Sequence, residues 1–374
     1  GRSDGRPAPV TRRRGRPVLL PESRSGHPRG PRAEPIGGPR AGREGPGSPS
    51  VRYVSTSDPV AGGSRRSETT ASWVLRILWL ALPLAVGPAV AEGLNDAPGP
   101  VRTTASVGLW ALWAVGLLAT LVPRPLSLAG VRLGGPAAFA TGVWAAVATG
   151  LSPTGLAGLV AGALVAGVSI SAPVGDRFVD GASYGDERRF LLRAPGPVVV
   201  VMVPLAWVVA VAGVVTGPLL VADGSLTAGI PACIVGLPAA GLAARATHQL
   251  GRRWVVLVPA GMVLHDHLAV ADPTLIPRTQ VSSVAPAATH TTATDLSQGA
   301  FGLALEVRCR DPLNMALRHG RRGSGAGSRT PVGAFLCTPA RPDVLLAEAA
   351  ARRLTSGAVP GQAARPPPTT SSPS

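Results

Sequence analysis

Lysine is absent from this chain of 374 residues, because all 36 of its basic side chains are arginine. Asparagine and isoleucine are scarce, whereas alanine, glycine, proline and valine are abundant, which is the codon usage of a very GC-rich genome. Much of the formal net charge of +16 therefore reflects mutational bias. The charge by itself does not indicate a nucleic-acid-binding protein, and nucleic acid is not an expected partner.

The chain has only three cysteines, and they do not form a disulfide framework. Cys233 lies in an apolar segment, whereas Cys309 and Cys337 lie in two predicted strands, which fits a reducing cytoplasmic side. Cys309 and Cys337 could meet as a redox pair on neighbouring strands. We favour the alternative, in which both are small buried hydrophobic residues.

Several cofactor and metal motifs are also missing: the sequence contains no Walker loop, CxxC or HExxH. We therefore expect no enzyme activity and no cofactor. The only cluster of metal-ligand types is His265-Asp266-His267, whose two histidines would share one face of a strand. Zinc would need a further ligand such as His290 or Asp272. We favour an exposed strand edge or turn, so no metal site is predicted.

Long apolar runs dominate residues 72–244, in a chain with 45% apolar residues and a mean hydropathy of +0.27. Each run has about the twenty residues that an α-helix needs to cross a bilayer. The sequence therefore predicts an integral membrane bundle of six transmembrane helices. These are residues 73–91, 103–122, 133–151, 154–172, 197–215 and 226–244. The third and fourth are separated only by Ser152 and Pro153, so they form either a hairpin or one broken helix.

The connections between these runs alternate between basic and arginine-poor. Arginines precede the first run, lie between the second and third and between the fourth and fifth, and follow the sixth. The positive-inside rule then places both termini in the cytoplasm of a cell with a plasma membrane. The interiors of the runs hold no ionisable side chain of the kind that transporters keep at bilayer depth, and Arg76 is close enough to one end to snorkel.

Residues 1–70 hold 14 arginines against six acidic residues, with few apolar side chains. We predict a disordered basic leader there, and a second disordered segment at residues 356–374. The leader is not a secretory signal, since its apolar run Val18-Leu19-Leu20 is too short. It either rests on anionic lipid or nucleic acid or, as we favour, is a solvated tail.

The cytoplasmic connection at residues 175–193 mixes acidic and basic side chains between glycines. Balanced charge of this kind is typical of internal ion pairs or of docking against another domain. The alternative is a solvated loop whose arginines serve only topology. The candidate docking residues are Asp176, Arg177, Asp180, Tyr184, Asp186, Glu187, Arg188 and Arg189.

Beyond Arg252 the apolar runs become short and alternate with polar residues, which predicts a small β-rich domain at residues 252–355. Its order of antiparallel strands closed by one C-terminal helix is that of a pleckstrin-homology-like (PH-like) barrel. The expected strands are 254–258, 262–265, 276–284, 303–309, 314–318 and 332–337, and the helix is 341–354. A glycine-rich basic hairpin tip either contacts anionic lipid headgroups through Arg318, Arg321, Arg322 and Arg329 or, as we favour, is a solvated loop.

Three blocks of sequence carry a resemblance. Residues 184–193 (YGDERRFLLR), 253–256 (RWVV) and 268–273 (LAVADP) look like blocks in uncharacterised multi-pass membrane proteins of high-GC Gram-positive bacteria. The resemblance covers residues 72–354. It implies the same architecture with a C-terminal PH-like domain, and it carries over no functional residue because that group has no assigned activity.

Together these observations predict a non-enzymatic membrane protein whose partner is the lipid bilayer. We expect a cell-envelope assembly or regulatory factor, with a cytoplasmic domain that contacts a protein partner or anionic headgroups. The alternative is a transporter or channel for a small uncharged solute. Gly158 and Gly162, at GxxxG spacing, would allow close helix packing or dimerisation.

Overall fold

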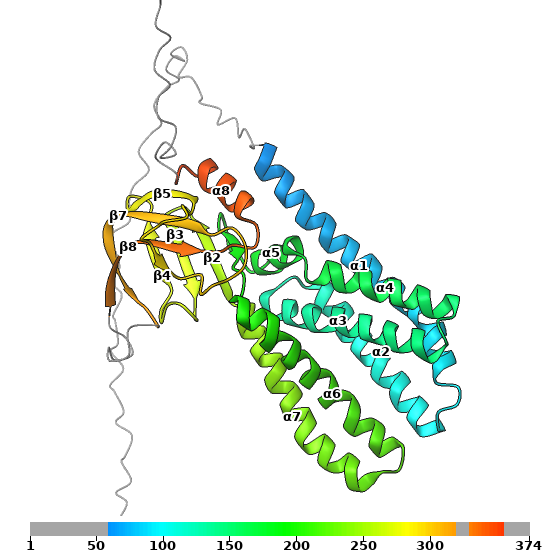
Figure 1. Cartoon of the computed structure of the whole chain (residues 1–374). Helices are drawn as coiled ribbons and strands as arrows, with labels where there is room; N and C mark the ends of the chain where they lie inside the picture. Colours follow the sequence, from blue (N-terminus) through cyan, green and yellow to red (C-terminus); the bar gives the residue numbers. More distant parts are fainter. Residues whose placement is uncertain (1–58, 319–328, 355–374) are drawn as a thin grey trace, which may run out of the picture. The chain divides into compact units, whose positions relative to one another are not determined.

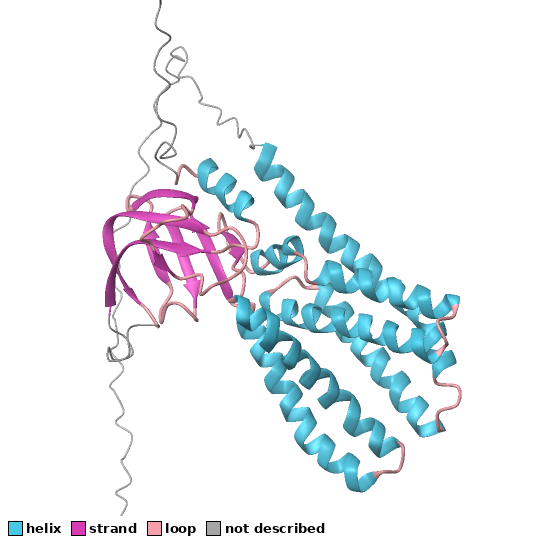
Figure 2. Cartoon of the chain, in the orientation of Figure 1, coloured by secondary structure: helices cyan, strands magenta, loops and turns pink. Residues whose placement is uncertain are grey.

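The computed structural model describes residues 59–318 and 329–354. In this part of the chain, long helices precede all but one of the strands, and one helix follows the last strand (Figures 1 and 2). The helices are α1 (Pro59–Gly93), α2 (Gly99–Leu121), α3 (Pro125–Ala148), α4 (Pro153–Ser169), α5 (Ala172–Asp180), α6 (Val203–Ala222), α7 (Leu226–Leu250) and α8 (Pro342–Ala351). A π-helical turn, Val198–Met202, leads directly into α6.

Four of the described helices are long and apolar enough to cross a membrane: α1, α2, α6 with its preceding turn, and α7. A fifth crossing is reached only if α4 and α5, which are bent by 53°, count as one broken span. The prediction of six crossings is therefore not confirmed. Arg132 and the sequence Gly134-Gly135-Pro136 interrupt the apolar run of α3, and α4 has only 17 residues.

Helices α3 and α4 form a hairpin, which settles the alternative left open for residues 133–172. The turn between them holds Gly150 and Leu151 with positive φ angles of 61° and 60°. A Cβ on Gly142 would lie 2.7 Å from the carbonyl oxygen of Gly158, and one on Gly162 would lie 2.7 Å from that of Ala138. The GxxxG pair of α4 thus packs inside the chain, where it allows two helix backbones to approach closely.

The N-terminal end of α1 corrects the prediction for the leader. Residues 59–70 were expected to be disordered, but they form the first turns of α1. Ser64 and Glu68 are buried there, so contacts with distant parts of the chain order a segment that has little apolar surface of its own. The remainder of the leader and the tail at 356–374 lie outside the described residues.

Strands of the described chain form two four-stranded sheets, followed by α8. The first has the order β1-β2-β3-β4 and is antiparallel throughout; the second has the order β5-β7-β8-β6, with β6 parallel to β8. The strands are β1 (Arg188–Leu191), β2 (Arg253–Val258), β3 (Gly261–Asp266), β4 (Thr274–Pro277), β5 (Val281–Pro286), β6 (Thr294–Asp295), β7 (Leu305–Ala316) and β8 (Arg329–Cys337).

Three strand predictions need correction. The expected strand 276–284 is two strands, β4 and β5, because a turn at residues 278–280 separates them. The expected strands 303–309 and 314–318 are one long strand, β7, whose register against β8 shifts between Arg308 and Leu313. The parallel pairing of β6 with β8 departs from the all-antiparallel order that was expected.

Strand β1 has the largest consequence for the architecture. It lies in the connection before α6, yet it pairs with β2, which follows α7, so that Phe190 is opposite Val255. The sheet domain is thus discontinuous in sequence, with the α6–α7 pair inserted into it. Prediction from composition missed this, because residues 175–193 read as a polar loop and the β-domain was expected to begin at residue 252.

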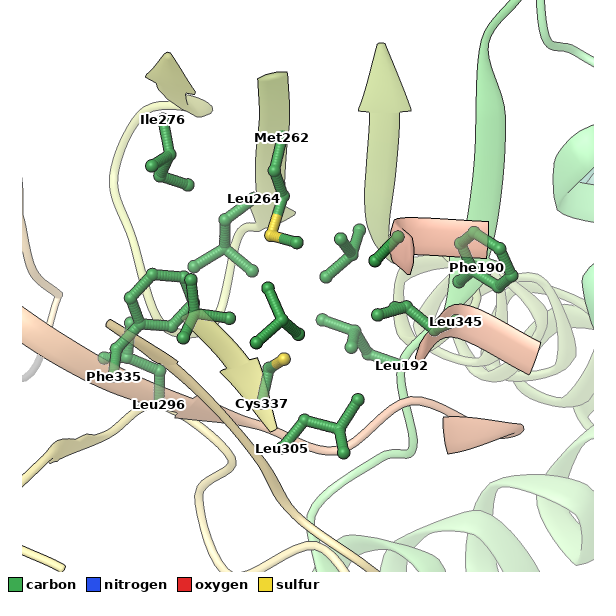
Figure 3. Packing of buried hydrophobic residues seen from close by; sticks show 14 of the residues in the cluster. Phe190, Leu192, Met262, Leu264, Ile276, Leu296, Leu305, Phe335, Cys337 and Leu345 are labelled. Atoms are coloured by element: carbon green, nitrogen blue, oxygen red, sulfur yellow. The ribbon is translucent and has the colours of Figure 1, made fainter. Parts of the chain in front are cut away.

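One apolar core joins the two sheets and α8 (Figure 3). Phe190 and Leu192, from the connection before α6, pack in it together with Leu345 of α8. Cys337 is buried in the same core, and burial raises the pKa of its thiol to about 12. Cys309 lies opposite Val281, whereas Cys337 lies opposite Leu305, and both thiols are free. The redox-pair alternative is therefore not supported.

Candidate functional site

A buried ionic cluster joins α1, α5, β1 and the start of α8. We name it the junction cluster and define it as Glu68, Asp180, Arg188 and Arg341. Arg188 is at its centre, with a side chain that is only 2% exposed, and its two terminal nitrogens bind the carboxylates of Glu68 and Asp180. Burial alone would lower the pKa of Arg188, but the bonds and charges of Glu68 and Asp180 raise it above the usual value.

Further hydrogen bonds of the cluster hold the start of α8 against α1 and the end of α5 against β1. Arg341, just before α8, donates to a Glu68 carboxylate oxygen at 3.1 Å and to the Ser67 hydroxyl at 3.2 Å. The second oxygen of Asp180 accepts the backbone N–H of Arg189 at 3.0 Å. Removing one partner from such a buried set is costly, because it leaves a desolvated charge behind. The cluster therefore ties the sheet domain to the N-terminal end of α1, the longest of the described helices.

Asp176 lies beside the junction cluster on α5. This short helix packs against β1 and carries Asp176, Arg177 and Asp180, so we treat it as outside the membrane-spanning segments. One oxygen of Asp176 accepts the backbone N–H of Leu191 at 3.0 Å, whereas Oδ2 is buried with no hydrogen-bond partner in the described chain. Burial raises the pKa of Asp176 to about 7, and the N–H bond from Leu191 only partly opposes the shift.

The eight candidate docking residues divide into two groups. Asp176, Asp180 and Arg188 are buried or nearly buried at the junction, and Arg189 binds Glu187 at 3.3 Å and lies over the Trp254 ring. Tyr184 and Asp186 face solvent, whereas Arg177 and Glu187 are half-buried. Tyr184 is 87% exposed. The residues that contact the helices are therefore those nearest the α5 and β1 backbones, rather than those at the tip between them.

A second polar region is a pocket of about 260 Å³ at the C-terminal end of α7. It is lined by Gln249, Arg252, His265, Asp266, His267, Val270, Ala271, Pro273 and Arg318. Backbone pairing positions Arg318: its N–H donates to the carbonyl oxygen of Ala269 at 2.9 Å, and Val270 bridges to Leu317. We call this the basic pocket, since it brings Arg318 to Arg252, His265 and His267, which lie much earlier in the sequence.

The one carboxylate of the basic pocket is already neutralised. Asp266 is buried and accepts two hydrogen bonds, at 2.8 and 2.7 Å, from the guanidinium of Arg253. This bidentate geometry is the strongest form of arginine–carboxylate pair. Among the described residues, no carboxylate binds Arg252 or Arg318. The pocket therefore carries uncompensated positive charge.

Both pocket histidines are held mainly neutral. His265 stacks on Trp254, with ring centroids 4.7 Å apart. Burial lowers the pKa of His265, and the positive charge of Arg252 lowers it further. Burial also lowers the pKa of His267, although the Asp266 carboxylate opposes this shift. Nδ1 of His267 is buried without a hydrogen-bond partner among the described residues.

The residues weighed for metal binding do not converge. Asp266 is occupied by Arg253, and Asp272 and His290 are exposed residues that are not part of the pocket lining. In residues 59–318 and 329–354, no three His, Cys, Asp or Glu side chains are placed to share a metal ion. The histidines lie on a strand and a turn that line a pocket, rather than on an open strand edge.

The four candidate lipid-contacting arginines have different outcomes. Arg318 lines the basic pocket, and Arg329 is exposed in β8 opposite Ala316. Arg321 and Arg322 lie outside the described residues. Sequence reasoning missed Glu68, Arg341 and Arg252, because each lies next to other charged or polar residues in the chain and acquires its role only through a partner far away in sequence.

In comparisons with protein-family models, with curated proteins and with solved structures, nothing matches this chain.

Proposed function

We propose that this chain is an integral protein of the cell membrane whose sheet domain acts on the cytoplasmic side as a lipid-contacting or protein-contacting module. In this proposal the protein is a non-enzymatic factor in assembly or regulation of the cell envelope. The observation that carries the proposal is the discontinuous sheet domain: β1 precedes the α6–α7 pair, and β2 follows it. A domain assembled in this way is held at one end of the spanning helices.

Pairing of β1 with β2 also bears on topology. The two strands must lie on the same side of the membrane, so the chain between them crosses an even number of times, as α6 and α7 allow. The bond between Glu68 of α1 and Arg188 of β1 imposes the same condition on the chain from α1 to α5. The proposed arrangement of six crossings with both termini in the cytoplasm satisfies both conditions and agrees with the arginine-rich connections.

The PH-like description of the sheet domain is part of the proposal. Two four-stranded sheets followed by a C-terminal helix support it, and so does the shared core into which Leu345 of α8 packs. The resemblance to multi-pass membrane proteins with such a domain is likewise proposed. Neither implies a ligand, because one fold serves many functions.

Cysteine labelling of intact cells tests the orientation. In a chain whose three native cysteines are replaced by serine, Pro98→Cys and Asp223→Cys should react with a membrane-impermeant maleimide added outside. Gly185→Cys, in the turn before β1, should react only after the cells are opened. Labelling of position 185 in intact cells would contradict the cytoplasmic placement of the sheet domain.

Vesicle permeability separates the proposal from the transporter alternative. Proteoliposomes containing the full chain should be no more permeable to glycerol or other small uncharged solutes than vesicles of lipid alone. A saturable increase in permeability, proportional to the amount of protein, would instead favour a transporter or channel and would count against the proposed non-transporting role.

A further inference from the structure

We propose that the basic pocket binds a phosphate ester anion, and that the source of this anion is the headgroup of a membrane phospholipid. The residues that would hold it are Arg252, Arg318, His265 and His267. The inference rests on the proposed function, since it names the chemistry that the sheet domain would contact at the membrane surface.

Charge is the first argument for an anion. The guanidinium groups of Arg252 and Arg318 line the pocket, and Asp266 is fully engaged by Arg253. The C-terminal carbonyl groups of α7 oppose an anion with a field equivalent to roughly half a negative charge. Two whole positive charges outweigh that field, so the pocket favours an anionic ligand.

Donor chemistry is the second argument, and it favours phosphate. A guanidinium presents several N–H groups in a planar fork that matches the oxygens of a phosphate. His267 adds a buried Nδ1 that has no partner among the described residues. A volume of about 260 Å³ accommodates a phosphate with a short polar substituent, which is the size of a phospholipid headgroup.

Position is the third argument, and it favours a lipid as the source. Gln249 lies in the last turn of the spanning helix α7, and Arg252 comes two residues after the helix ends at Leu250. Cytoplasmic arginines next to the end of a spanning helix lie within reach of anionic headgroups. A headgroup can therefore enter the pocket while its acyl chains stay in the bilayer, whereas a soluble phosphate must be captured from dilute solution.

Native mass spectrometry of the full chain in detergent tests the inference. With added phosphatidylglycerol, the protein should retain one lipid per chain and should prefer it over phosphatidylcholine. The double variant Arg252→Gln with Arg318→Gln should weaken retention by roughly tenfold or more, since each arginine contributes separately. Arg252→Lys with Arg318→Lys keeps the charge but loses the planar donor fork, so its lipid retention should lie between that of the parent and that of the glutamine variant.

A matched control removes two charges from elsewhere in the same domain. Arg310→Gln with Arg353→Gln changes exposed residues of β7 and of the segment after α8 that do not line the pocket, and it should leave lipid retention unchanged. Equal loss in both double variants, or no preference for phosphatidylglycerol in the parent, would overturn the inference. Titration with sn-glycerol 3-phosphate distinguishes the sources: tight binding of the soluble ester, with no lipid retention, would replace the lipid by a soluble phosphate ester.

Failure of this inference is separable from failure of the proposed function. If position 185 is labelled only in opened cells but phosphatidylglycerol is not preferred, the pocket assignment alone is wrong. If position 185 is labelled from outside, the cytoplasmic placement is wrong whatever the lipid measurement gives.

Discussion

The guanidinium of Arg188 in β1 bonds to the carboxylate of Glu68, which lies 120 positions earlier in α1. Both side chains are almost completely buried. Each charge offsets the cost of removing the other from water, so burial of either one alone would be strongly unfavourable. Because of this pair, the connection before α6 is not a free loop. It is fixed both to α1 and to the sheet domain. A substitution that destabilises the helices is therefore expected to destabilise the sheet domain as well, and the reverse also holds.

Substitution of Glu68 by glutamine should lower the free energy of unfolding by about 3 kcal/mol, because a buried arginine loses a charged partner. Thermal unfolding of the purified protein, followed by the reactivity of the buried Cys337 thiol, measures the loss. Glu187→Gln is the control: its bond to Arg189 is partly exposed, so the expected change is below about 1 kcal/mol. Equal effects of the two substitutions would contradict a central role for the Glu68–Arg188 pair.

Substitution of Gly213 by leucine should separate α6 from α7. A Cβ at this position would lie 2.2 Å from the carbonyl oxygen of Gly236, so the two backbones cannot stay where they are. Overpacking of this kind costs about 1 to 3 kcal/mol, and the melting temperature should fall accordingly. Gly241→Leu in α7 is the matched control, since nothing lies within 4 Å of its Cβ position. A smaller fall for Gly213 than for Gly241 would show that the helix contact is not tight.

The sequence could predict the elements that depend on local pattern. All six apolar segments lie within helices except for a few terminal residues, namely 122, 149–151 and 170–171. The strands around Val255, Leu264 and Phe335 were also predicted, because alternation of apolar and polar residues is a local signal. The number of helices that cross the membrane could not be predicted from this pattern, because Arg132 and a glycine-rich stretch interrupt the apolar run of α3.

The elements that depend on distant partners could not be predicted. In the sequence, Arg188 and Arg189 indicate only a charged segment. Nothing near them indicates a strand that pairs with residues 253–258 across two intervening helices. Arg318 was expected in a solvated basic tip, whereas its pairing with Ala269 brings it to the basic pocket. Whether a charged residue is buried depends on the tertiary fold, and the pattern of residues in one sequence does not contain that information.

Asp176 should give the protein a distinct pH dependence. Its pKa is raised to about 7 in the folded state, so the proton it holds stabilises the fold. That contribution is complete below the ordinary carboxyl pKa, decreases as pH rises, and is lost above about 7. Asp176→Asn cannot ionise, so this variant should be more stable than the parent at pH 8, with the difference closing toward pH 4.

Unfolding of parent and variant at matched pH values measures this difference directly, and other groups that titrate in both proteins cancel. Asp180→Asn is the contrasting control. It removes a partner of Arg188 and should lower stability at pH 8 rather than raise it. An Asp176→Asn variant less stable than the parent at pH 8 would show that the carboxylate, not the protonated acid, is the form that the fold prefers.

Anion binding in the basic pocket should strengthen as the pH falls from 8 to 6. Burial lowers the pKa of both His265 and His267, so both imidazoles are mostly neutral in the empty pocket at pH 7. A bound phosphate ester favours the charged imidazoles and raises these pKa values, so proton uptake accompanies binding. Other charged groups that face the histidines are Arg252, Arg253, Arg189 and Asp266.

Lipid retention measured at several pH values checks this expectation with phosphatidylglycerol as the probe. In the double variant His265→Gln with His267→Gln, the affinity should be weaker at pH 6 than in the parent and nearly independent of pH. His290→Gln, an exposed histidine that is not part of the pocket lining, should keep the parent's dependence. Because a phospholipid phosphodiester does not titrate in this range, an unchanged dependence in the pocket variant would mean that the proton is taken up elsewhere, and the two histidines would not be ligands.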